Sequence, residues 1–300
     1  MSTPFVPFEA ERDLDWIALT DALARAHDLP KAAVTDSFLY RGKDTLLNRA
    51  AWIDGLGSLV KTATIFPGNA EHGLPAVNGG VTLYSDKTGV AEALLDFHLV
   101  TKWKTAGDSL LAARRLARPD SRRILVLGAG TVAASLIEAY GAAFPAARFE
   151  IWNRTPEKAV ALAERYGASV AEDLPEAVGR ADIVTSATMS TTPILHGEWL
   201  RPGQHVDLIG AYRPDMREAD DAAMVRARIF VDSYDTTIEH IGELIEPLLS
   251  GAIGKADVVA DYYELAAFER APEDITLFKN GGGAHLDLMT SRYILEAWKG

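Results

Sequence analysis

The chain has 300 residues, of which 48% are hydrophobic and 24% charged, a composition typical of a well-packed globular protein and not of a disordered one. Its formal net charge of -12 argues against non-specific binding to nucleic acid or to anionic lipid, but leaves room for a local pocket that binds a small anion. Because the chain contains no cysteine, disulfides and thiolate chemistry are excluded.

The start of the chain predicts a cytoplasmic protein, because "MSTPFVPFEAERDLDW" lacks the basic start and apolar core of a signal peptide. The run "ILVLGAGTVAASLIEAYGAAF" (124–144) approaches membrane-spanning length. It contains glycines in its first half and Glu138 in its second, so it divides more naturally into a strand, a turn and a helix. We therefore predict no membrane-spanning segment.

The first part of the chain predicts a domain rich in β-structure. An amphipathic helix is expected over 13–27, followed over 36–96 by short strands separated by turn signals such as "PGN", "NGG" and "DKTG". Helical spacing returns from His98 to about Ala117, and "RPDSRR" then forms a polar joint that contains proline. We place a domain boundary near Pro119.

Beyond the boundary, strands alternate with helices. Strands are expected at "RILVLGAG", "RFEIWN", 182–188, 205–211 and 228–233, and helices at 131–143 and 155–166. Such alternation predicts an α/β fold with a doubly wound parallel sheet covered by helices. The closing segment "TLFKNGGGAHLDLMTSRYILEAW" predicts a strand, a glycine hinge and a helix that folds back on the first domain. The predicted organisation is a discontinuous α+β domain of residues 1–119 and 282–300, and a sheet domain of residues 120–281.

A dinucleotide-binding signal lies in "LVLGAGTVAASL", where Gly128, Gly130 and Ala133 form G-x-G-x-x-A between a strand and a helix. Gly128 permits the tight turn, Gly130 lets a pyrophosphate approach the backbone, and the small Ala133 allows close helix packing. The phosphates would then face the helix N-terminus. This context, more than the motif itself, predicts a Rossmann domain.

The end of the second strand bears on the choice of cofactor. An NAD-preferring domain usually has a carboxylate there to bind the ribose 2′-hydroxyl, whereas this chain has Asn153, Arg154 and Thr155. Arg154 would attract a 2′-phosphate, and its neighbours can add hydrogen bonds, so NADPH is the predicted cofactor. Thr155 before "PEK" is also a good helix N-cap with proline at N1.

Lys61 lies within a run, Leu59 to Phe66, that otherwise has the pattern of a buried strand. Burying an ammonium without a partner is costly, so such a lysine is paired, has a lowered pKa, or turns towards water. One interpretation is an edge-strand lysine that extends its head group into solvent. The other is a functional lysine in a pocket.

Several stretches of the chain resemble the ornithine cyclodeaminase/mu-crystallin family in order and spacing. They are "LVKTATIFPGNAEHGLPAVNGGVTLYSDKTG", "LVTKWKTAGDSLLAARRLARPD", "ILVLGAGTVAASL", "PILHGEWLRPGQHVDLIGAYRPDMRE" and "TLFKNGGGAHLD". The resemblance covers nearly the whole chain. It implies a Rossmann domain flanked by a substrate and dimerisation domain made from both chain ends, and hence a homodimer.

The resemblance also implies a site. Lys61 matches the family's active-site lysine, Arg49 and Lys104 match basic residues that bind the substrate carboxylate, and Asp287 matches an aspartate at the start of the last helix. Lys104 replaces the usual arginine and lacks its bidentate geometry. Together with the motif and strand-end positions, the predicted cofactor-binding residues are Thr105, Gly128, Gly130, Thr131, Val132, Asn153, Arg154, Thr155, Ala187, Thr188, Met189 and Gly210.

One difference between this chain and the cyclodeaminases of the family indicates the branch that it resembles. Cyclodeaminases carry an aspartate where this chain has Tyr212, which is either a hydroxyl of the substrate pocket or a packing aromatic. The chain therefore resembles the reductase branch, which implies reduction of the C=N bond of an α-imino acid (ketimine), or the reverse reaction. A cyclodeaminase that uses NAD transiently and a non-catalytic NADPH-dependent binding protein remain the alternatives. The seven histidines show no metal-binding spacing, so no metal is predicted.

Overall fold

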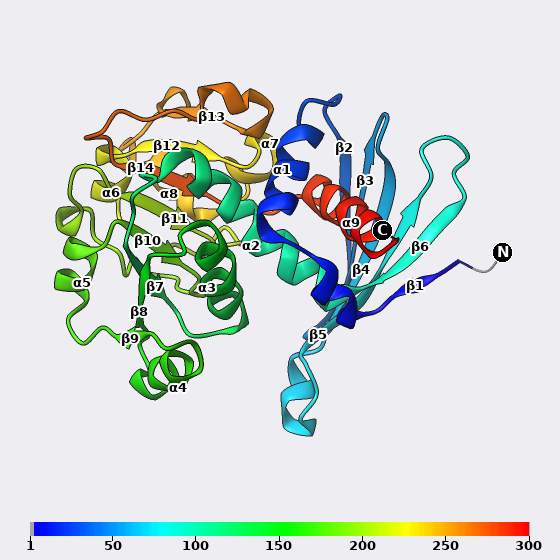
Figure 1. The fold of residues 1–300 in the computed structure, drawn as a ribbon, viewed down its shortest axis with the longest axis horizontal. Coiled ribbons are helices and arrows are strands. Elements are labelled where there is room, and N and C mark those ends of the chain that lie inside the picture. The colour runs from blue at the N-terminus through cyan, green and yellow to red at the C-terminus, as the bar shows by residue number, and fades with distance from the viewer. Residues whose placement is uncertain (1–2, 300) are drawn as a thin grey trace. The chain divides into compact units, whose positions relative to one another are not determined.

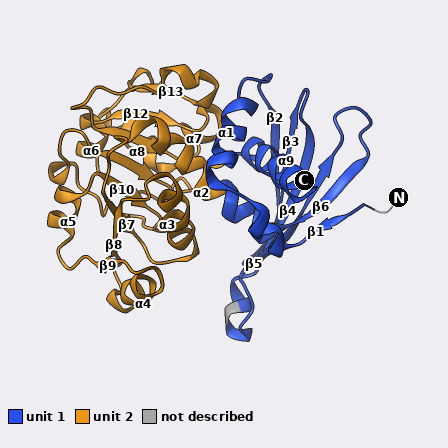
Figure 2. Cartoon of the chain, viewed as in Figure 1, with its two compact units in different colours: residues 1–104, 283–300 blue, residues 105–282 orange. Residues whose placement is uncertain are grey.

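The chain builds two units, and the first takes residues from both chain ends. In the computed structural model, which describes residues 3–299, unit 1 comprises residues 1–104 and 283–300 and unit 2 comprises residues 105–282 (Figure 2). The sequence predicted this division near Pro119. The division falls instead within one continuous helix, α2 (Phe97–Leu116), so the proline marks the end of that helix.

Unit 1 contains a six-stranded sheet in the order β1-β6-β5-β4-β3-β2 (Figure 1). Neighbouring strands are antiparallel except β1 and β6. Its strands are β1 (Phe5–Val6), β2 (Ala33–Arg41), β3 (Asp44–Ile53), β4 (Gly57–Ile65), β5 (Val77–Tyr84) and β6 (Ala91–Asp96). Its helices are the 3-10 helices Phe8–Asp13 and Pro67–His72, α1 (Trp16–Ala26), the start of α2, and α9 (Ala284–Lys299).

Helix α9 packs against α1 and against strands β3 and β4 of unit 1 (Figure 1). The period-2 alternation of β4 turns Leu59, Lys61 and Ala63 to the buried side of the sheet. The opposite side of the sheet is exposed and apolar, with Trp52 56% and Val60 38% accessible to solvent. Unit 1 therefore has one covered face and one uncovered face.

Unit 2 contains an eight-stranded, wholly parallel sheet in the order β13-β12-β14-β11-β10-β7-β8-β9. Its strands are β7 (Arg123–Leu127), β8 (Arg148–Trp152), β9 (Ser169–Val170), β10 (Ile183–Ser186), β11 (His205–Leu208), β12 (Arg228–Val231), β13 (Val258–Ala260) and β14 (Thr276–Lys279). The chain order reverses between β7 and β10, which is the switch point where such sheets bind ligands. The predicted α/β class and Rossmann topology are confirmed.

Helices connect the strands of unit 2. They are α3 (Thr131–Ala143), α4 (Pro156–Tyr166), α5 (Leu174–Arg180), α6 (Asp221–Arg226), α7 (Tyr234–Thr237), α8 (Gly242–Ser250) and the 3-10 helices Gly197–Trp199, Lys255–Asp257 and Tyr262–Ala267. Helix α3 has its predicted bounds, and α4 begins after Thr155 with Pro156 at N1. Within residues 3–299, no helix is both long and apolar enough to cross a membrane.

Candidate active site

Lys61 lies on β4, in the interior of the unit 1 sheet and not at its edge. Its side chain is 7% exposed and lies on the same side as Leu59 and Ala63. The interpretation of an edge-strand lysine that extends into solvent is therefore wrong. A buried ammonium requires a partner, which the last helix of the chain supplies.

Asp287, in the first turn of α9, accepts a hydrogen bond from Lys61 Nζ at 2.8 Å and is fully buried. Arg49 faces Lys61 across β3 and β4, and its Nη1 lies 3.9 Å from Asp287 Oδ2. The other end of the Arg49 guanidinium donates to Asp36 Oδ2 at 2.7 Å. Phe97 closes one side, with its ring centroid 4.8 Å from Lys61 Nζ.

Burial and neighbouring cations give Lys61 an unusually low pKa of about 8, against an ordinary value of 10.5. Desolvation is the main cause, and the charges of Lys104 and Arg49 add to it, while Asp287 opposes the shift. Burial would raise the pKa of Asp287, but the charges of Lys61, Lys104 and Arg49 outweigh it and lower that pKa. Lys61 therefore exchanges its proton near neutral pH.

Lys104 and His285 complete the polar group of unit 1. Lys104 is buried in α2. His285 is buried two residues before Asp287, and desolvation with the charge of Lys104 lowers its pKa to about 4, so it is neutral at pH 7. Sequence reasoning missed His285 because one buried histidine matches no motif. Tyr212 belongs to unit 2, where it is 58% exposed beside the Arg213 guanidinium.

The glycine motif follows β7 as its spacing predicts. Gly128 has a φ of +108°, and a Cβ there would lie 2.8 Å from the carbonyl oxygen of Ala187, so this turn requires glycine. Gly130 is the N-cap of α3 and takes no side-chain cap, and a Cβ on it would meet nothing within 4 Å. The first-turn N–H groups of α3 therefore have no side-chain cap, which fits a helix start that binds a dinucleotide pyrophosphate. Thr131 and Val132 begin that helix, while Ala133 is buried.

The end of β8 carries the residues predicted to select the cofactor. Arg154 is exposed at the surface of the protein. Asn153 donates its side-chain amide to the carbonyl oxygen of Thr155 at 2.8 Å, so it shapes the turn. Arg154 is therefore available to bind an anion.

The segments after β10 and β11 meet at the same edge of the sheet as the glycine motif. Gly210 packs so closely that a Cβ would lie 1.7 Å from the carbonyl oxygen of Thr188. Met189 is 79% exposed and Ala187 partly buried. Thr105, in α2, accepts a hydrogen bond at its carbonyl oxygen from Asn280. Two fully buried acids missed from the sequence, Glu218 and Glu243, lie among these segments.

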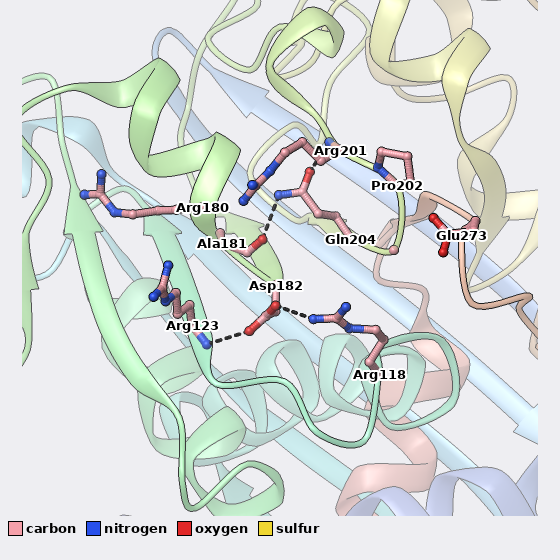
Figure 3. Close-up of a pocket in the computed structure, with 10 residues that line it drawn as sticks. Arg118, Arg123, Arg180, Ala181, Asp182, Arg201, Pro202, Gln204 and Glu273 are labelled. Carbon is pink, nitrogen blue, oxygen red and sulfur yellow. Dashed lines mark hydrogen bonds and ion pairs between the residues drawn. The ribbon is translucent and has the colours of Figure 1, made fainter.

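The opposite, amino edge of the unit 2 sheet holds a hollow of about 500 Å³ lined by arginines (Figure 3). Asp182 accepts hydrogen bonds there from Arg118 and from the backbone N–H groups of Arg122 and Arg123. Arg180 is paired with Glu150. The Arg118–Asp182 and Arg180–Glu150 ion pairs neutralise part of the local positive charge. Within the described chain, no group of histidines and carboxylates is placed to hold a metal ion.

The parallel sheet, the glycine turn and the uncapped helix define a dinucleotide-binding protein with a second unit that buries a lysine–aspartate pair. The chain belongs to the ornithine cyclodeaminase/mu-crystallin family, whose model matches residues 54–300. The resemblance seen in the sequence is thereby confirmed.

Three relatives illustrate the similarity. A Delta(1)-pyrroline-2-carboxylate reductase of Paracoccus denitrificans is 50% identical over 97% of this chain and 96% of its own. The ketimine reductase mu-crystallin of Rattus norvegicus is 34% identical over 79% of this chain and 75% of its own. The Thermococcus litoralis Delta(1)-pyrroline-2-carboxylate reductase, solved with NADH and L-proline, has a TM-score of 0.88 at 25% identity, covering 98% of this chain and 97% of its own.

The coupling of Lys61 to Asp287 can be measured directly. We expect Asp287→Asn to lower the Lys61 pKa below 8, because it removes the carboxylate that opposes the shift. The pH dependence of Lys61 acylation, followed by mass spectrometry, reports this pKa. Asp36→Asn is the control, since Asp36 bonds to Arg49 and not to Lys61. A Lys61 that titrates near 10.5 in the unaltered protein would contradict this prediction.

Proposed function

We propose that this protein reduces the C=N bond of a small anionic imino acid with a nicotinamide dinucleotide, or catalyses the reverse reaction. The observation that carries the proposal is the cluster of buried Lys61, Asp287 and Lys104 with half-buried Arg49. It combines a proton-exchanging ammonium with cations suited to a substrate carboxylate. The names of the pyrroline-2-carboxylate and ketimine reductases cited above support the same reaction.

Arg49 and Lys104 bind the substrate carboxylate in this proposal. Asp36 accepts a hydrogen bond from Nη2 of Arg49, so the orientation of the guanidinium is already partly fixed. Lys104 contributes a compact point charge and no bidentate geometry, which leaves the directional bond to Arg49. Charge attraction within a buried site is worth more than it is at the surface.

Lys61 supplies the proton. Bound dinucleotide supplies the hydride chemistry, and one hydride to the imine carbon with one proton to the imine nitrogen balances reduction of the C=N bond. A lysine with a pKa of about 8 is largely protonated at pH 7 and releases its proton readily, as a general acid must. Asp287 holds the Nζ atom in place through the transfer.

A cyclic five-membered imino acid is the substrate class that we propose first, on the strength of the 50% identity to a reductase of that substrate. We propose NADPH as the preferred cofactor, because the end of β8 presents the exposed Arg154 and no carboxylate. Gly128, Gly130 and the start of α3 would hold the pyrophosphate.

We also propose a homodimer that forms through the uncovered face of the unit 1 sheet. That face carries a hollow of about 560 Å³ whose lining includes Ala33, Trp52 and Val60. Strand β2 at its edge is exposed along its whole length, and Leu39 lies on this same side of the sheet. A continuous apolar surface of this kind marks an association site.

The reaction is tested by the loss of reduced-nicotinamide absorbance. We expect the protein to oxidise NADPH with cyclic ketimines, and Lys61→Met to reduce kcat/KM by at least about 10²-fold, the usual contribution of a general acid. The panel includes linear 2-oxo acids with ammonia or methylamine, iminosuccinate, and ornithine with NAD.

The double variant Lys61→Met/Asp287→Asn controls for folding, since it leaves no carboxylate without its lysine partner. Both variants are expected to bind the dinucleotide as the unaltered protein does. Release of ammonia from ornithine, with no imine reduced, would instead indicate a cyclodeaminase.

Cofactor preference is tested by Arg154→Ala. We expect the KM for NADPH to rise about tenfold or more, the size of a lost charge-assisted hydrogen bond, while the KM for NADH stays the same. Arg165→Ala, an exposed arginine of α4 that stacks on Tyr166, is the matched control. An equal change for both cofactors would show that Arg154 does not read the 2′-phosphate.

Association is tested by Trp52→Glu, followed by light scattering on a size-exclusion column. We expect a monomer, because a charge in the centre of an apolar interface is costly to bury. Val160→Glu places the same charge at an exposed apolar residue of α4 in unit 2 and should leave the mass unchanged. A dimer that survives Trp52→Glu would place the interface elsewhere.

A further inference from the structure

Glu218 is a fully buried carboxylate at the carboxyl edge of the unit 2 sheet, and it gathers five hydrogen-bond donors. Its Oε1 accepts from Ser186 Oγ at 2.6 Å and from both the N–H and the Oγ1 of Thr188 at 2.8 Å. Its Oε2 accepts from the N–H of Gly210 at 2.6 Å and of Ala211 at 3.3 Å. One side chain therefore ties the segment after β10 to the segment after β11.

The arrangement of donors on both sides of the Glu218 side chain requires a carboxylate at this position. An ionised carboxylate only accepts hydrogen bonds and can do so at both oxygens, whereas an amide would turn an NH₂ group towards donors on one side. Three of the five donors are backbone N–H groups, which cannot rotate to become acceptors. A buried donor left without an acceptor is costly, so the segments would move apart.

Glu218 is itself fixed by a second buried acid. Glu243, in the first turn of α8, accepts from the N–H of Glu218 at 2.8 Å and from that of Ala219 at 2.9 Å. The contact of Gly210 with Thr188 leaves no space for a Cβ between the two segments. The two segments and the two acids therefore cannot shift easily relative to one another, because the backbone of one segment is in direct contact with the backbone of the other.

We propose that Glu218 is a positioning residue that fixes these two segments for the nicotinamide half of the dinucleotide. The inference rests on the proposed function and on the prediction from the sequence that Thr188 and Gly210 contact the cofactor. Glu218 is fully buried, and both of its carboxylate oxygens accept hydrogen bonds from the two segments, so it acts through the backbone that it holds. The adenosine half would be held separately, by the glycine turn after β7 and by Arg154 after β8.

The separation of the two halves gives the test. We expect Glu218→Gln to raise the dissociation constant of NADH about tenfold, equal to about 1.4 kcal/mol, and to leave that of ADP-ribose within about twofold. ADP-ribose lacks the nicotinamide, so the ratio of the two constants isolates the nicotinamide contribution. Isothermal titration calorimetry on the full chain measures both constants, and thermal unfolding gives the stability of each variant.

Asp182→Asn is the matched control. Asp182 also accepts two backbone N–H groups, those of Arg122 and Arg123, but at the opposite edge of the same sheet. Figure 3 shows the bond from Arg123. We expect it to lower the melting temperature and to leave the ratio of the two constants unchanged. Ser186→Ala removes one donor to Glu218 from a fully buried position, so it covers the case in which Glu218→Gln does not fold, and should raise the ratio about twofold to threefold.

Two outcomes would overturn the inference. One is a Glu218→Gln protein whose ratio of the NADH and ADP-ribose dissociation constants is unchanged, with or without an equal weakening of both. The other is the same altered ratio in Asp182→Asn. Failure of the proposed reaction is a separate result. A protein that reduces no imine can still show the altered ratio in Glu218→Gln, and a protein that reduces imines can show an unaltered one.

Discussion

The buried pair of Lys61 and Asp287 is the interaction on which unit 1 depends. The two residues are 226 positions apart in the sequence, one on an interior strand and the other on the last helix. Each charge on its own would carry a large desolvation penalty, and the pair is tolerated because each compensates the other. Helix α9 is thereby fixed to the sheet by the same contact that sets the protonation of Lys61, so fold and chemistry share one constraint.

Unit 2 uses buried acids for a related purpose. The segments after its strands leave the sheet and lose their ladder partners, so their N–H groups need other acceptors. Glu218 supplies them after β10 and β11, and Asp232 accepts the N–H of Gly281 at 3.0 Å and of Gly282 after β14. The carboxyl edge of the sheet is thus held by side chains that could not be replaced by apolar ones.

Much of this fold could be predicted from periodicity. The alternation of strands and helices predicted the parallel sheet, and the glycine motif placed α3 at its observed bounds. Strands β9 and β13 have two and three residues, so they are too short to show the alternation of apolar and polar residues that predicts a strand. In the site, Lys61 was conspicuous because a charge interrupted an apolar strand. The pairing of Glu218 with five donors could not be predicted, because the segment "RPDMRE" gives no sign of whether its glutamate is exposed or buried.

Strand β2 has a consequence for how the chain behaves before it is fully folded. It ends the sheet, so one row of its backbone groups has no neighbouring strand, and its run "SFLY" exposes the large side chains of Phe38, Leu39 and Tyr40. Such an edge is a template for intermolecular β-pairing. Asp36 and Arg41 flank the run and are held in ion pairs with Arg49 and Asp44. These charges act as gatekeepers, so the acid that orients Arg49 also protects the chain from aggregation.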